Sequence, residues 1–103
     1  MYRPLPDYLT IEPSFIEGLG LFTTEYIVDG IEIGMTHVYR QRPHKEIELI
    51  RTPLGGFINH SDDPNCELID LVGEKHLKTI RDIRPGEELT LKYKLYNVSS
   101  SSI

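Results

Sequence analysis

The sequence of 103 residues contains one cysteine, Cys66, and no tryptophan. A single cysteine cannot form an internal disulfide, and no pair of cysteines or histidines has the spacing of a zinc site. We therefore expect no bound metal and a reducing, intracellular setting. The histidines are scattered along the chain, and a surface or structurally satisfied role is favoured for all but His60; they are His37, His44, His60 and His76.

Long apolar runs are also missing. The N-terminal residues lack the continuous apolar core of a signal peptide, and no segment approaches the ~20 apolar residues that a membrane span requires. The sequence therefore predicts a protein that is neither secreted nor inserted into a membrane.

Basic residues are outnumbered, with 11 Lys and Arg against 16 Asp and Glu, for a formal net charge of -5. Nucleic-acid-binding proteins usually present a basic face, so we expect no nucleic-acid partner. An acidic chain would attract a basic partner such as a lysine-rich peptide. The alternative, that the charge only aids solubility, stays open.

The chain is ordinary in its content of hydrophobic (39%) and charged (26%) residues, and its length fits one small globular domain. Short alternating segments separated by turn residues, with almost no helical periodicity, predict a mainly β domain. The turns expected are Asp29-Gly30, a type II′ hairpin at Gly73-Glu74 and a type II turn at Pro85-Gly86. The strands expected are residues 8–15 (an edge strand ending in a turn), 21–24, 31–39, 47–51, 66–72, 75–81 and 89–93, with residues 40–45 as an exposed loop.

The stretch from Gly55 to Asn65 combines apolar, amide, imidazole and hydroxyl side chains where a plain connector needs none of them. Its apolar residues, Phe57 and Ile58, favour burial and would draw the following Asn59 and His60 into a partly dry site, where both need hydrogen-bond partners. The polar residues after them, Ser61, Asp62 and Asn65, can bond neighbouring backbone groups and keep the loop well defined. A loop with a satisfied histidine remains the alternative.

Residues 57–61, followed by Pro64-Asn65, resemble the central motif of SET-domain protein lysine methyltransferases. Residues 18–22 and 85–93 resemble two further motifs of that family, in the same order along the chain. The resemblance implies a SET-type β-clip fold of short curved sheets, closed by a C-terminal pseudo-knot that brings the last segment beside the central motif. It also implies a single SET domain at residues 9–97. The two prolines near the start indicate an irregular lead-in at residues 1–8, and the serine-rich composition of residues 98–103 predicts a disordered tail.

The resemblance further implies methyl transfer from S-adenosylmethionine to a lysine side chain of a protein substrate, histone-like or other. Such an in-line displacement at carbon needs no metal and no covalent intermediate. The family's motifs assign the residues. They give Tyr93 as the catalytic hydroxyl, Asn59 and His60 as cofactor-binding residues, and Gly18, Leu19 and Gly20 as the turn that cradles the methionine part. Phe57 and Tyr96 could line the lysine channel, although ordinary packing is at least as plausible for both.

The sequence departs from the family's pattern in four respects. Asp62 stands where a cysteine is usual, on a turn where we expect little effect, and Lys92 stands where aspartate is common. The segment between Tyr39 and Phe57 is shorter than the family's insert, and no cysteine-rich flank is present. A minimal core of this kind resembles small viral or bacterial SET proteins, which complete their walls by dimerisation, so a homodimer is possible. Two alternatives stay open: a SET-like module that only binds cofactor or a peptide, and a structural β protein.

Overall fold

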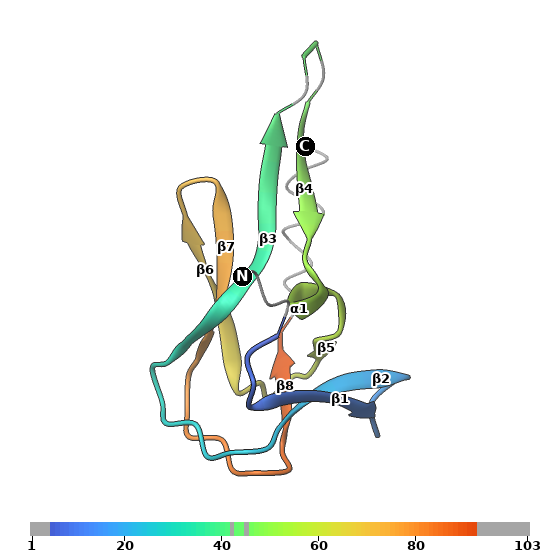
Figure 1. Ribbon diagram of the computed structural model, residues 1–103, viewed down its shortest axis with the longest axis vertical. Coiled ribbons are helices and arrows are strands. Elements are labelled where there is room, and N and C mark those ends of the chain that lie inside the picture. The colour runs from blue at the N-terminus through green and yellow to red at the C-terminus, as the bar shows by residue number, and fades with distance from the viewer. Residues whose placement is uncertain (1–4, 42, 45, 93–103) are drawn as a thin grey trace.

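The computed structural model of the chain describes residues 5–41, 43–44 and 46–92, which form β-strands and one short helix. Neighbouring strands follow the order β1-β2-β8-β6-β7-β3-β4, and β5 pairs with β8 (Figure 1). The mainly β prediction is confirmed. The elements are β1 (Leu9–Pro13), β2 (Leu19–Thr23), β3 (Glu32–Gln41), β4 (Ile47–Arg51), α1 (Pro53–Gly56), β5 (Asn59–His60), β6 (Cys66–Leu71), β7 (Glu74–Thr79) and β8 (Glu88–Leu91).

The last strand, β8, lies between segments from the start and the middle of the chain. It runs antiparallel to β2, where Leu21 pairs with Leu89, and parallel to β5, where His60 pairs with Leu91. The backbone N–H of Ser61 donates to the carbonyl of Leu91 at 3.0 Å and extends this contact. The side chains of Leu89 and Leu91 are buried, which explains why this strand is held inside the sheet. Its apolar alternation, visible in the sequence, therefore fixes the centre of the fold.

Two hairpins extend from this centre, β3–β4 and β6–β7, and Figure 1 shows them side by side. The loop predicted from residue 40 starts too early, because Arg40 and Gln41 continue β3 and pair with Glu48 and Ile47 of β4. The Arg40 guanidinium also lies 3.4 Å from the Glu48 carboxylate. Polar side chains are compatible with a strand whose surfaces both face water, and the hydrophobic pattern alone could not reveal this.

The β6–β7 hairpin is confirmed, but its turn differs from the predicted one. Leu71 pairs directly with Glu74, so the two turn residues are Val72 and Gly73, one position earlier than expected. The positive φ of +79° falls on Gly73, the second of the two, whereas a type II′ turn requires it on the first. The type II prediction at Pro85-Gly86 is correct: Gly86 has a φ of +89°, and the N–H of residue 87 donates to the carbonyl of residue 84 at 3.0 Å.

The short helix α1 was not predicted, because four residues are too few to show a helical period. Its start follows a common pattern, with Thr52 as the N-cap and Pro53 at the first helical position. The Thr52 hydroxyl accepts from the N–H of Gly55 at 3.3 Å and donates to the carbonyl of Met35 at 2.7 Å. These bonds tie α1 to β3 and set the direction in which the chain continues to β5.

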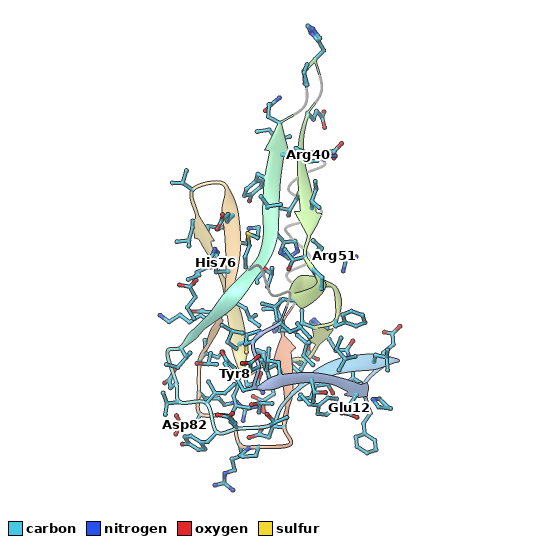
Figure 2. All side chains as sticks on the ribbon, in the orientation of Figure 1. Tyr8, Glu12, Arg40, Arg51, His76 and Asp82 are labelled. Carbon is cyan, nitrogen blue, oxygen red and sulfur yellow. The ribbon has the colours of Figure 1, made fainter. Side chains whose placement is uncertain are left out.

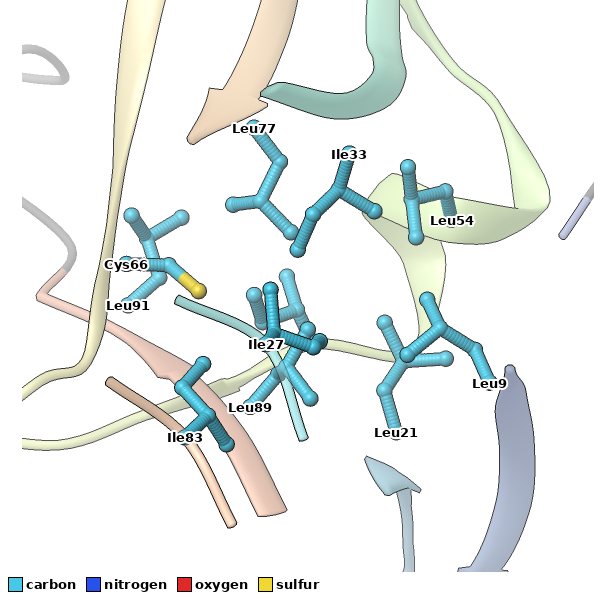
Figure 3. Packing of buried hydrophobic residues seen from close by; sticks show 11 residues of the cluster. Leu9, Leu21, Ile27, Ile33, Leu54, Cys66, Leu77, Ile83, Leu89 and Leu91 are labelled. Atoms are coloured by element: carbon cyan, nitrogen blue, oxygen red, sulfur yellow. The ribbon is translucent and has the colours of Figure 1, made fainter. Parts of the chain in front are cut away.

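One apolar core connects these elements, and Figure 3 shows Leu54 of α1 beside residues contributed by the strands. Cys66 lies in this core, and burial raises the pKa of its thiol to about 12, which keeps the sulfur protonated and unreactive. No helix among the described residues is long and apolar enough to cross a membrane. The core residues are Leu9, Leu21, Ile27, Ile33, Leu54, Ile58, Cys66, Leu77, Ile83, Leu89 and Leu91.

His76, labelled in Figure 2, lies on β7 and contacts two carboxylates. Its Nδ1 faces Glu32, and its Nε2 lies 2.6 Å from the Glu74 carboxylate. Both partners accept hydrogen bonds, so only the doubly protonated ring can donate to both. The bonds to Glu74 and Glu32 raise the pKa of His76 above 6.5, against the effect of burial. The prediction that this histidine is structurally satisfied is therefore correct.

We expect His76→Gln to remove a pH-dependent part of the stability. Because the pKa of His76 is higher in the folded than in the unfolded chain, its stabilisation is fully present below pH ~6.5 and is lost as pH rises through the folded pKa. The free energies of unfolding of wild type and variant, measured in urea between pH 5.5 and 9, should therefore differ most at the acidic end and converge at the basic end. Glu74→Gln keeps the His76 ring but removes one of its two carboxylate partners. In a Glu74→Gln background, the pH-dependent gap in unfolding free energy caused by His76→Gln should therefore be smaller. A gap that is constant with pH would contradict this account.

Candidate functional site

Asn59, on β5, meets the glycine turn at the start of β2. Its side-chain nitrogen donates to the backbone carbonyls of Glu17 at 3.1 Å and Leu19 at 3.2 Å. These contacts join residues about 40 positions apart in the sequence. The structure thus brings together Asn59 and the turn at Gly18–Gly20, two of the segments that the sequence motifs single out.

The two glycines of this turn have different structural roles. Gly18 adopts a positive φ of +50°, and its carbonyl accepts from the N–H of Ser14 at 2.8 Å, which closes the bend. Gly20 lies within β2 and is buried. A β-carbon there would lie 2.1 Å from the carboxylate oxygen of Glu88 and 3.1 Å from the side-chain nitrogen of Asn59. Gly20 therefore permits the close approach of these two polar groups to the turn.

His60 follows Asn59 on β5 and is half-buried. Its Nε2 lies 3.2 Å from a carboxylate oxygen of Asp62. Asp62 is on an exposed turn, as expected, but it contacts the ring of a candidate site residue, so its substitution for the usual cysteine has a local consequence. The backbone of His60 lies beside Leu91 of β8, two residues before Tyr93.

Glu88 and Ser14 belong to the same cluster, and the sequence motifs did not single them out. The Glu88 carboxylate accepts from the Ser14 hydroxyl at 2.8 Å and from the side-chain nitrogen of Asn59 at 2.8 Å. Ser14 also accepts from the N–H of Ile16 at 2.9 Å, so it caps the loop that leads into the glycine turn. Glu88 lies inside one of the motifs, and that position is the only sequence signal. The contact with Ser14, 74 positions away, leaves no signal in the sequence.

Asn65 has a different role from the predicted one. Instead of bonding neighbouring backbone groups, its buried amide reaches β8, where Nδ2 donates to the carbonyl of Glu88 and Oδ1 accepts from the N–H of Thr90, both at 2.8 Å. The side chain thus replaces a neighbouring strand for these two backbone groups. Ser61 behaves as expected, since its hydroxyl accepts from the N–H of Asp63 at 3.1 Å.

The remaining predicted site residues contribute less to the observed cluster. Phe57 is half-buried and packs against the apolar core, which agrees with ordinary packing as an alternative to a channel role. Tyr93 and Tyr96 lie outside the described residues, as does the passage of the chain that would complete the predicted pseudo-knot. Among the residues that the structure describes, no group of three or more His, Cys, Asp or Glu side chains could hold a metal ion.

A small curled β domain, in which the last strand lies against an Asn-His bend beside a glycine turn, is a domain of the SET type. A model of the SET domain matches residues 43–94, about half of the chain, and the chain belongs to this family. The methyltransferase domain of human PR domain-containing protein 2 has the same fold, with a TM-score of 0.71 and 19% identity over 87% of this chain and 79% of that one. The predicted fold class is thereby confirmed.

Two curated relatives are similar in sequence over part of the chain. The H3 lysine-36 specific histone-lysine N-methyltransferase of Cryptococcus neoformans is 39% identical over 67 residues, which cover 58% of this chain and 8% of that protein. Histone-lysine N-methyltransferase trithorax of Drosophila virilis is 50% identical over 42 residues, covering 37% of this chain and 1% of that protein. The chain thus spans less than a tenth of either relative. Both are eukaryotic, and the likeness to viral or bacterial cores stays a prediction.

Proposed function

We propose that this chain transfers a methyl group from S-adenosylmethionine to a lysine side chain of a protein substrate. The observation that carries the proposal is the contact of Asn59 with the carbonyl of Leu19, because it places the central motif on the glycine turn. Membership of the SET family and the position of β8 beside His60 support it. The proposed catalytic unit is one domain at residues 9–97, with residues 98–103 as a tail.

The polar groups at the turn fit the amino-acid end of this cofactor. The carbonyls of Glu17 and Leu19 and the carboxylate of Glu88 converge on the nitrogen of Asn59, so the site is rich in hydrogen-bond acceptors and carries negative charge. An ammonium group, which only donates, suits a site with acceptors and negative charge nearby. We assign cofactor binding to Gly18, Leu19, Gly20, Asn59 and His60. When bound, the cofactor supplies an activated methyl group.

The remaining requirements fall on the lysine. A free lysine has a pKa of about 10.4, and an apolar channel disfavours its charged form, which leaves the neutral amine that can attack. Holding amine and methyl group in line can contribute roughly 7–11 kcal/mol at most. We assign the hydroxyl beside the amine to Tyr93, which follows β8 by two residues, and the channel walls to Phe57 and Tyr96. A phenol stays neutral near pH 7 and can accept a hydrogen bond.

The partner that this function requires is a lysine-containing protein or peptide. The net charge of -5 favours a basic, histone-like segment over nucleic acid. Because the segment between Tyr39 and Phe57 is short, a second copy of the chain could complete the substrate groove. A homodimer is therefore part of the proposal.

Calorimetric titration with S-adenosylmethionine, followed by a transfer assay with labelled cofactor and histones, tests the function. We expect saturable binding, and label on lysine residues located by mass spectrometry. Tyr93→Phe should lower transfer about tenfold or more while leaving cofactor binding unchanged. Tyr39→Phe is the matched control, since Tyr39 lies on β3 in the projecting hairpin, and it should change neither quantity.

The outcomes separate the alternatives. Binding without transfer to histones or to a cell lysate would favour a module that only holds the cofactor or a peptide. A flat titration, with a chain that is folded by circular dichroism, would exclude both the enzyme and the cofactor-binding module. Equal losses in the two tyrosine variants would remove Tyr93 from the catalytic role.

A further inference from the structure

Glu88 joins three segments that are distant in sequence. Its carboxylate accepts hydrogen bonds from the Ser14 hydroxyl, at 2.8 and 3.0 Å to its two oxygens, and from Asn59 at 2.8 Å. Its own residue begins β8 and pairs with Phe22 of β2. The carboxylate is packed against Gly20, so closely that a β-carbon there would overlap it. Glu88 is therefore held in one position by contacts on several sides.

This position determines which end of the Asn59 amide faces which way. A primary amide has a nitrogen that only donates and an oxygen that only accepts, and a carboxylate only accepts. All the recorded partners of the Asn59 nitrogen, namely Glu17 O, Leu19 O and the Glu88 carboxylate, are acceptors. The bond to Glu88 is the shortest and the only charge-assisted one, so it is the strongest of the three. The oxygen of the amide therefore points away from Glu88.

We propose that Glu88 is a positioning residue, whose carboxylate orients the Asn59 amide so that its oxygen accepts a hydrogen bond from the α-ammonium group of the cofactor. This inference rests on the proposed function and assigns a task to a residue outside the cofactor-binding set given above. An amide turned the other way would present its NH₂ group, a donor, to a group that can only donate. The negative charge of Glu88 adds a second attraction for the ammonium.

Glu88→Gln tests the proposal with little change in shape. The new amide can donate to the Asn59 oxygen, so the charge-assisted bond that favours the observed orientation is lost, and only the carbonyls of Glu17 and Leu19 still favour it. We expect S-adenosylhomocysteine to bind about tenfold more weakly by calorimetry. The same molecule lacking only its α-amino group should bind the variant and the wild type within about twofold, since it has no ammonium to lose. Wild type should bind the complete molecule more tightly than the deaminated one.

Two further variants make the result interpretable. Glu87→Gln removes the same charge from the adjacent residue, whose carboxylate accepts from the N–H of Arg84 and does not contact Asn59, and both ligands should bind it as they bind wild type. Ser14→Ala frees the other side of the Glu88 carboxylate. Because the Ser14 hydroxyl also caps the loop before the glycine turn, both ligands can lose affinity, but the complete molecule should lose about two- to threefold more than the deaminated one. If Glu88→Gln does not fold, Ser14→Ala tests on its own whether Glu88 positions the Asn59 amide.

A purely structural Glu88 would give a different pattern. Equal weakening of both ligands in Glu88→Gln or Ser14→Ala, or no weakening in a folded Glu88→Gln, overturns the positioning role while the proposed function stands. A wild type that binds neither ligand overturns both.

Discussion

Replacing Asn65 with aspartate should cost the folded state about 3–5 kcal/mol at pH 7. The amide is buried and forms both of its recorded side-chain bonds with the backbone of β8. Aspartate has the same shape, but it offers an oxygen where the amide nitrogen donates to the carbonyl of Glu88. A charged acceptor would then face a carbonyl acceptor without water. Because small domains have a total stability of about 5–15 kcal/mol, this loss should be visible as a fall in Tm of at least ~12 °C.

The loss should also depend on pH, with a sign that identifies its cause. In the folded Asn65→Asp variant, burial and the facing carbonyl raise the pKa of the introduced carboxyl above its usual value near 3.9. The protonated carboxyl can donate to the carbonyl of Glu88, so the deficit relative to wild type should be smallest below pH ~4 and should grow as pH rises through the folded pKa. Urea unfolding at pH 4 and pH 7 measures both values.

Gln41→Glu is the matched control for charge, because it makes the same amide-to-acid change on the exposed end of β3. We expect it to alter stability by less than about 0.5 kcal/mol. An Asn65→Asp variant as stable as this control at pH 7 would show that the amide does not hold β8 in place.

Sequence reasoning performed best where the deciding signal is local. The Pro85-Gly86 turn follows from two adjacent residues whose backbone preferences define a type II turn. The last strand follows from the alternation of Leu89 and Leu91, and the β6–β7 hairpin from two apolar runs around Gly73. Each of these depends on residues a few positions apart, and the structure confirms each, apart from the β6–β7 turn, which lies one residue earlier than expected and is not of type II′.

The contacts that build the candidate site were less accessible, because they join distant residues. The motifs indicated that Asn59 and the glycine turn belong to one site, but the link between Ser14 and Glu88 spans 74 positions. The amide of Asn65 was expected to bond nearby backbone groups, since asparagine often does so in turns. It bonds β8 instead, because the loop is folded against that strand and burial leaves no water to satisfy its backbone groups.

Gly55 and Gly56 are adjacent and indistinguishable in the sequence, yet the structure predicts opposite effects of alanine. A β-carbon on the buried Gly55 would lie 2.4 Å from the backbone carbonyl oxygen of Thr36. That oxygen also accepts from the N–H of Thr52 at 2.8 Å, so β3 cannot move away without breaking the bond that anchors α1. A β-carbon on the exposed Gly56 would meet nothing within 4 Å.

We therefore expect Gly55→Ala to destabilise the fold by about 3 kcal/mol, in the range of overpacked cores. Gly56→Ala should be neutral or stabilising by up to ~1 kcal/mol, because alanine favours helix over glycine. Thermal and urea unfolding of both variants measures the difference. Because α1 directs the chain into β5, Gly55→Ala should also displace Asn59 from the glycine turn and weaken cofactor binding, whereas Gly56→Ala should not. Equal stability of the two variants would mean that α1 is not packed against Thr36, and the path from β4 to Asn59 would have to be different.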